Sequence, residues 1–161
     1  MALLRAQGPG HPEISVFLRI GLGQRFVQTF LMSARKQDLD VTLQPDLSAP
    51  ERARNSIEDV KDRMSEEVLD DVKLLVNELV TNSVKFAGKG RIELRLAASD
   101  EAIRVEVHDD GPGFAPNRTE PSLGDTSGRG LFLVNALADR WGVTLDGTTC
   151  VWFEIDAEGA A

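Results

Sequence analysis

Residues 74–87, which read LLVNELVTNSVKFA, place three polar residues at helical spacing within an apolar pattern. Glu78, Asn82 and Lys85 stand at i, i+4 and i+7, so on an α-helix they fall within about 60° of one another, along one edge of the apolar face. Burying a carboxylate, an amide and an ammonium at such an edge costs desolvation free energy unless something binds them. The helix either lines a binding pocket or carries two solvated charges and an incidental amide, and its sequence alone leaves both interpretations open.

Length, charge and cysteine content limit the class of protein. The 161 residues suffice for one core of ordinary size. A net charge of −8 argues against direct binding to nucleic acid, because phosphates need clustered lysine and arginine. Cys150 is the only cysteine, which excludes an internal disulfide and fits a reducing compartment. Since the sequence has no run of 18 apolar residues and no secretory signal, we expect a cytoplasmic protein without a membrane partner.

Local patterns divide the chain into an N-terminal extension (1–40), a domain (41–156) and a tail (157–161). The extension is broken by glycine and proline, and we expect it to pack poorly. The first half of the domain predicts a strand at 41–44, a helix that starts at a Ser48-x-x-Glu51 capping box and ends near Met64, a helix from Ser65 to Gly88, and alternating strands at 91–98 and 102–108.

The second half of the domain begins with a long polar loop, residues 115–126, of the kind that forms lids or binding loops. A helix over 131–140, ended by Gly142, and a hairpin of strands 143–145 and 149–155 follow. This order predicts an α+β fold, a two-layer sandwich with the helices packed on one face of a mixed, mainly antiparallel sheet.

Two glycine-containing segments flank the long loop. Asp109-x-Gly111-x-Gly113 follows a strand, so the carboxylate is held at the end of the sheet, and the glycines permit a sharp turn or close approach to a flat ligand. An ordinary turn would use the same residues. Gly128-x-Gly130 precedes a helix and offers backbone N–H groups to a phosphate, while Arg129 points either to that phosphate or to solvent. Neither a P-loop nor a dinucleotide-binding fingerprint is present in the sequence.

In this order, Glu78-x3-Asn82-x2-Lys85, Asp109-x-Gly-x-Gly113 and Gly128-x-Gly130-Leu131 resemble the three nucleotide-binding boxes of the Bergerat-fold ATPases. The segments ELVTNSV, VHDDGPGF, SGRGL and ADRWGV are similar to those of the bacterial anti-sigma regulatory factor serine/threonine-protein kinases, particularly the actinobacterial type. The resemblance covers about residues 41–155 and does not include the first 40.

The resemblance implies ATP and Mg²⁺ as ligands and assigns a role to each box. Asn82 would hold Mg²⁺, Glu78 would act as general base, and Lys85 would face phosphate. Asp109 would accept the adenine amino group, beside backbone made accessible by Gly111 and Gly113. The phosphates would be closed in by the remaining predicted residues, namely Ser127, Gly128, Arg129, Gly130 and Leu131.

Cys150 occupies the position at which relatives usually carry a threonine that helps to fix adenine. Thr149 is one residue earlier, and we expect it to reach the nucleotide only through a bulge, because strand side chains alternate between faces. A nucleotide-independent or non-catalytic binding module is therefore an alternative to a kinase. A fragment of a sensor histidine kinase fits less well, because His11 lies between Gly10 and Pro12, a poor site for a phosphoaccepting helix.

The family resemblance also implies protein partners. The kinase would phosphorylate an anti-sigma-factor antagonist and sequester a sigma factor. We expect a homodimer, with residues 14–31 available for dimerisation or for docking of a partner.

Overall fold

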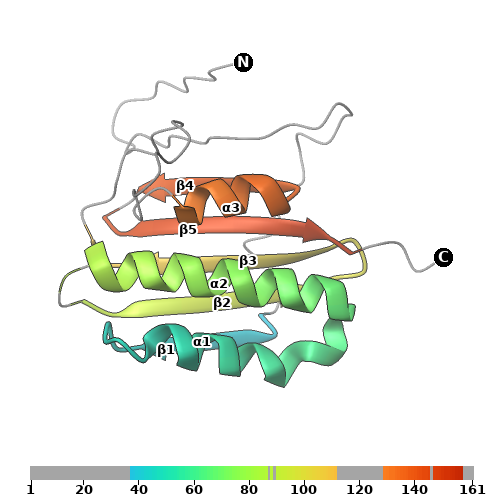
Figure 1. The fold of residues 1–161 in the computed structure, drawn as a ribbon, viewed down its shortest axis with the longest axis horizontal. Coiled ribbons are helices and arrows are strands. Elements are labelled where there is room, and N and C mark those ends of the chain that lie inside the picture. Colours follow the sequence, from blue (N-terminus) through green and yellow to red (C-terminus); the bar gives the residue numbers. More distant parts are fainter. Residues whose placement is uncertain (1–36, 87, 89, 112–128, 146, 158–161) are drawn as a thin grey trace, which may run out of the picture.

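The structure is a computed structural model, which describes residues 37–86, 88, 90–111, 129–145 and 147–157. Its five strands are β1 (Leu39–Leu43), β2 (Ile92–Ala98), β3 (Ala102–Asp109), β4 (Arg140–Leu145) and β5 (Thr149–Asp156). They form one sheet in the order β1-β2-β3-β5-β4, and every pairing is antiparallel (Figure 1). The predicted α+β sandwich is confirmed, but the described sheet contains no parallel pair and so is not mixed.

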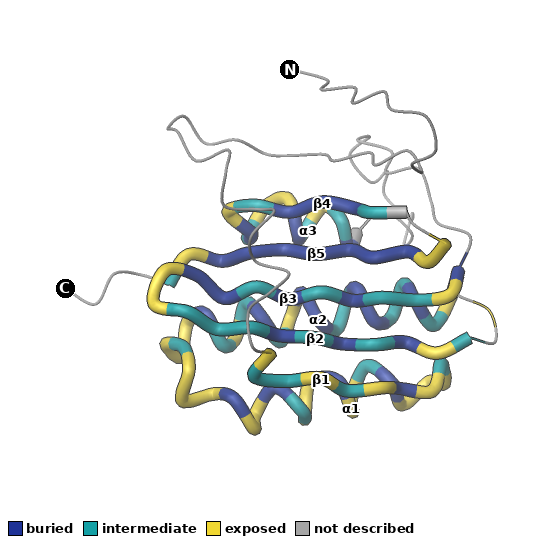
Figure 2. The backbone as a smooth tube through the Cα atoms, turned by 180° about the vertical axis from the view of Figure 1, so that it is seen from behind, coloured by how far each residue is buried: buried dark blue, intermediate teal, exposed yellow. Residues whose placement is uncertain are grey.

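The helices α1 (Ala49–Ile57), α2 (Glu66–Phe86) and α3 (Arg129–Leu137) cover one face of this sheet (Figure 1). The core lies between the two layers, because α2 turns an apolar stripe toward alternating apolar residues of the strands. Its largest fully buried members include Val72, Leu75, Val76, Val80, Ile92, Leu94, Leu96, Val105, Val107 and Phe153. No helix of the described residues lies on the other face of the sheet, which Figure 2 shows from behind. The half-buried residues of β2 and β3 alternate with the buried ones and so belong to this other face.

The start of α1 differs from the predicted capping box. The Ser48 hydroxyl makes no capping hydrogen bond; it donates to Asp46 Oδ1 over 2.7 Å and accepts a hydrogen bond from the Arg52 guanidinium. The same carboxylate accepts the Ser48 N–H at 2.9 Å and lies 3.1 Å from the Arg52 guanidinium. Asp46 therefore organises this helix start. The helix also ends earlier than predicted, since residues Glu58–Arg63 form the 3₁₀ helix η2.

The prediction that Gly142 ends the helix after residue 140 is wrong. The helix ends at Leu137, and Gly142 lies inside β4, opposite Trp152 of β5. A Cβ atom at position 142 would stand 2.8 Å from the Trp152 indole, so this glycine permits close packing in a strand. By contrast, Ser65 starts α2 as predicted, since its hydroxyl accepts the Val68 N–H at 3.3 Å, and Gly88 has a φ of 72°.

Four predicted features lie outside the described residues: the extension up to residue 36, the long loop, Asp146 of the hairpin turn, and the tail beyond residue 157. In the part of the chain that the structure describes, none of the helices is long and apolar enough to cross a membrane.

Candidate functional site

A pocket opens between the C-terminal half of α2 and the adjoining ends of β3 and β5. It is lined by Leu79, Asn82, Ser83, Phe86, Val107, Asp109, Gly111, Thr149 and Val151. The apolar members form its walls, and the polar members gather where the two strands meet the helix. A flat ligand with an apolar surface and a polar edge fits such a lining.

Asp109 is the last residue of β3, and two donors hold its carboxylate. Ser83 Oγ donates to Oδ2 over 2.7 Å, and the Gly111 N–H donates to Oδ1 over 2.9 Å. Thr149 Oγ1 in turn donates to the Gly111 carbonyl oxygen over 3.1 Å. These three bonds join α2, the turn after β3 and the start of β5. Sequence reasoning missed Ser83, a buried hydroxyl on the apolar side of a helix.

Thr149 reaches the pocket without a bulge, so the expectation from its position next to Cys150 is wrong. The β3–β5 register is continuous and pairs His108 with Cys150 and Asp109 with Thr149. Residues directly opposite each other in antiparallel strands share a face. Thr149 therefore lies on the face of Asp109, toward α2, while the Cys150 side chain lies near His108 on the other face.

The predicted stripe on α2 is only partly inside the pocket. Asn82 lines it and is half-buried; Glu78 is half-buried one turn earlier and lies outside the lining. The Asn77 side-chain amide lies 3.4 Å from Glu78 Oε1. Lys85 is exposed near the end of α2 and does not line the pocket. The carboxylate and the amide thus lie on consecutive turns of α2, and of the two only the amide lines the pocket.

The start of α3 comes close to this stripe at Gly130. A Cβ atom there would stand 2.6 Å from Asn82 Nδ2 and 3.5 Å from Glu78 Cβ. The fold therefore brings the second glycine segment against the first polar motif, although 48 positions separate Asn82 from Gly130 in the numbering. Leu131 packs partly buried against the core. Arg129 begins α3, while Gly113, Ser127 and Gly128 lie outside the described residues.

The residues present fit a nucleotide and a magnesium ion. Each Asp109 oxygen accepts one hydrogen bond within the protein and retains the capacity to accept a second, from a ligand amino group. Oxygen ligands such as the Asn82 side-chain carbonyl are the type that Mg²⁺ prefers. The apolar side chains of Val107, Val151 and Leu79 in the lining suit the faces of a purine.

Known proteins are similar to this chain in sequence. The chain is 33% identical over 88 residues to the serine-protein kinase RsbW of Staphylococcus epidermidis, covering 45% of this chain and 55% of that protein. It is 31% identical over 90 residues to the RsbW of Listeria monocytogenes serotype 4a, covering 47% and 57%. The aligned region is thus about half the length of these curated relatives.

A solved histidine kinase domain of a blue-light-activated histidine kinase from Erythrobacter litoralis aligns with 68% of this chain and 60% of its own, at 27% identity and a TM-score of 0.45. Residues 43–155 match the histidine kinase-like ATPase domain family, a span that includes the pocket, the α2 stripe and both glycine segments. With that match over most of its length, the chain belongs to the family of histidine kinase-like ATPase domains.

Proposed function

We propose that this chain binds Mg-ATP in the pocket at Asp109 and acts as a serine/threonine-protein kinase. The observation that carries the proposal is the Asp109 carboxylate, held by Ser83 and the Gly111 N–H, with Asn82 in the same lining. A fixed carboxylate at the end of an apolar slot selects a ligand amino group and rejects a carbonyl in the same place. Adenine carries an amino group on the ring carbon where guanine carries a carbonyl oxygen.

Asn82, Lys85 and Glu78 then serve the phosphate end of the nucleotide. Asn82 would hold Mg²⁺, whose charge neutralises phosphate oxygens, and the exposed Lys85 can turn toward them. The Glu78 carboxylate would orient the substrate hydroxyl and accept its proton as the oxygen bonds to the γ-phosphorus and ADP leaves. Serine or threonine supplies that hydroxyl, and no covalent intermediate with the enzyme is required.

The substrate and partners in this proposal follow from similarity to proteins named as serine-protein kinases RsbW. We propose an anti-sigma-factor antagonist as the phosphorylated protein and a sigma factor as the sequestered partner. The same resemblance supports a cytoplasmic homodimer.

Phosphoryl transfer from labelled ATP to the cognate antagonist tests the kinase proposal. Glu78→Ala should reduce transfer by at least about 100-fold while Mg-ATP still binds, since loss of a general base affects chemistry more than binding. Glu67→Ala is the matched control, because it removes an exposed carboxylate from the same helix about three turns away. Equal transfer by wild type and Glu78→Ala would contradict the assignment of the base.

Calorimetry with Mg-ATP separates the two halves of the proposal. Binding without transfer to the antagonist would indicate a non-catalytic nucleotide-binding module. Absence of binding would overturn the nucleotide site itself.

A further inference from the structure

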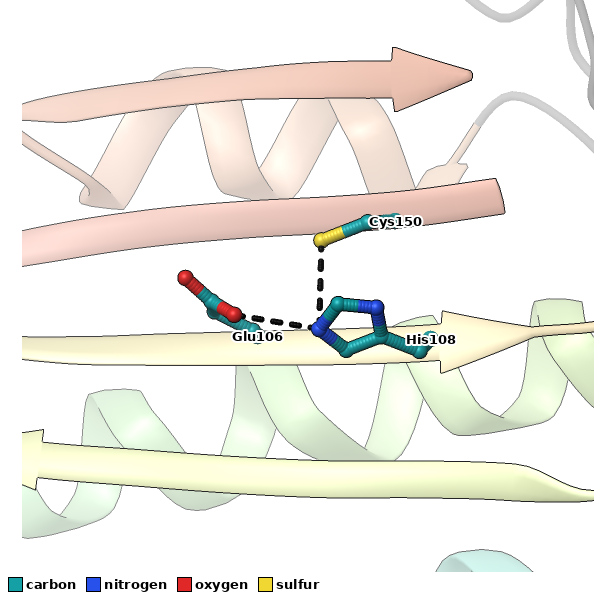
Figure 3. A group of neighbouring side chains, drawn as sticks. All are labelled: Glu106, His108 and Cys150. Carbon is teal, nitrogen blue, oxygen red and sulfur yellow. Dashed lines mark hydrogen bonds and ion pairs between the residues drawn. The ribbon is translucent and has the colours of Figure 1, made fainter. Parts of the chain in front are cut away.

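We propose that Glu106, His108 and Cys150 form a Zn²⁺ site on the face of the sheet that points away from α1, α2 and α3, opposite the nucleotide pocket. His108 Nε2 lies 3.0 Å from Glu106 Oε2 and 3.6 Å from Cys150 Sγ. The potential ligand atoms of the three residues all lie within 4.8 Å of one another. Figure 3 shows the carboxylate and the thiol approaching the same ring nitrogen from β3 and β5.

The strand register explains why these side chains meet. Glu106 and His108 are two residues apart on β3, so they project from the same face. Cys150 is the direct partner of His108 on β5. Two strands thus present three donor atoms to one side of the sheet, where Glu106 and His108 side chains remain 24% exposed and a cation can enter.

The spacing agrees with tetrahedral zinc coordination. With Zn–N of about 2.05 Å and Zn–S of about 2.3 Å, two tetrahedral ligand atoms stand about 3.5 Å apart, close to the observed separation of Cys150 Sγ and His108 Nε2. The corresponding N···O separation is about 3.4 Å, against 3.0 Å observed, so the Glu106 carboxylate would shift away from His108 Nε2 on binding zinc. Thiolate, imidazole and carboxylate are all established zinc ligands, and three of them leave a fourth position for water.

The geometry is unsuited to a catalytic Cys-His-Glu relay. In such a relay the carboxylate binds one ring nitrogen and orients the other toward the nucleophile. Here both the carboxylate and the thiol lie at Nε2, so no proton could pass through the ring between them.

Neighbouring residues prepare Glu106 for the cation. Arg104 Nε donates to Glu106 Oε1 over 2.8 Å, which leaves Oε2 directed at His108. Arg104 NH1 also donates to Glu154 Oε1 over 2.9 Å, and Arg140 Nε donates to Glu154 Oε2 over 2.6 Å, so Glu154 helps to fix the Arg104 guanidinium in place. Such outer contacts orient metal-binding carboxylates in known sites.

Titration of the metal-free 161-residue chain with Zn²⁺ in the presence of a competing chelator tests the site. We expect one Zn²⁺ per chain. Both Cys150→Ser and His108→Gln should weaken binding at least about tenfold, because each removes a ligand from a three-ligand site. Glu93→Gln is the matched control: Glu93 pairs with His108 from β2, and its carboxylate contacts Arg91 and Arg95.

Cobalt substitution adds a readout that a structural role for these residues would not produce. Co²⁺ bound at this site should show a thiolate-to-cobalt charge-transfer band in the near ultraviolet, and Cys150→Ser should abolish it. Circular dichroism of each metal-free variant checks the fold, and the partly exposed His108 provides a second variant if Cys150→Ser does not fold. Unchanged Zn²⁺ affinity in both variants, or Co²⁺ binding without the thiolate band, would overturn the proposal.

Discussion

The Asp109 carboxylate is held by two hydrogen bonds, and neither exhausts its capacity to accept further donors. Asp109→Asn should raise the dissociation constant for Mg-ATP at least about tenfold, because the amide no longer offers two negatively charged oxygens to an amino group. The ratio of ATP to GTP affinity should fall as well. Isothermal calorimetry with both nucleotides measures these changes.

Asp110→Asn is the control for that comparison. Asp110 is exposed, accepts a hydrogen bond from the Arg91 N–H at 3.1 Å, and does not line the pocket. Its substitution should leave nucleotide affinity unchanged. A similar loss of ATP affinity in both variants would show that Asp109 acts through local charge and does not select the base.

Gly130 matters because of the space it leaves for Asn82. In Gly130→Ala, the new Cβ would meet Asn82 Nδ2, the flexible end of that side chain, so the amide should be displaced while the helix persists. We expect the Mg²⁺-dependent affinity for ATP to fall about tenfold with little change in melting temperature. A double-mutant cycle with Asn82→Ala measures the coupling. Fully additive effects of the two substitutions would contradict an action of Gly130 through Asn82.

At the scale of elements, β4 begins earlier than sequence periodicity indicates, and Gly142 packs against Trp152 inside it. Gly142→Ala would place Cβ 2.8 Å from Trp152 Cζ2, and the ring is also held by Arg104, whose guanidinium lies 4.3 Å from its centroid. We expect destabilisation by about 1–3 kcal/mol, as for other overpacked sites, measured by urea unfolding.

Gly147→Asn provides the control for Gly142. Gly147 has a φ of 71°, a Cβ atom added there would meet nothing within 4 Å, and asparagine tolerates the left-handed region. Its substitution should cost less than that of Gly142. The reverse order would mean that turn geometry limits this hairpin more than contact with Trp152 does.

The start of α1 provides a pH-dependent prediction. Hydrogen bonds from Ser48 and Arg52 lower the pKa of Asp46 from 3.8 to about 2. Because the folded-state pKa is lowered, this carboxylate stabilises the fold above about pH 4, and its contribution is lost as the pH falls toward 2. Asp46→Asn should therefore lower the melting temperature slightly at pH 6, with the difference from wild type vanishing near pH 2. A difference independent of pH would contradict this origin.

For the whole molecule, periodicity predicted the order and type of the described elements, because apolar faces of helices and strands have different spacing. It could not predict that β5 lies between β3 and β4, since pairing of distant strands leaves no local pattern. For that reason the prediction that Thr149 would need a bulge to reach the pocket was wrong. Likewise, Glu106 and His108 have the alternating polarity of a solvated strand face, and only the register with Cys150 brings the three together.

The two proposed sites use neighbouring register pairs of the same two strands, β3 and β5. His108 and Cys150 face away from the helices, while their neighbours Asp109 and Thr149 form the next register pair and line the pocket. A cation that bridges β3 and β5 at the first pair should restrict opening of the second, because the backbone of each strand connects them. We therefore expect Zn²⁺ to slow amide hydrogen exchange at Gly111 and Thr149 by about tenfold or more.

Exchange measured without nucleotide is the informative comparison, since ATP phosphates themselves bind Zn²⁺. Cys150→Ser should remove the effect of Zn²⁺ on exchange, whereas Glu93→Gln should preserve it. If Zn²⁺ binds with a thiolate ligand but leaves exchange at residues 109–111 and 149 unchanged, the site exists and is not coupled to the pocket. If exchange does slow, Zn²⁺ stabilises the paired state of β3 and β5. If the nucleotide also favours that state, thermodynamic linkage requires that each ligand change the affinity for the other by the same factor.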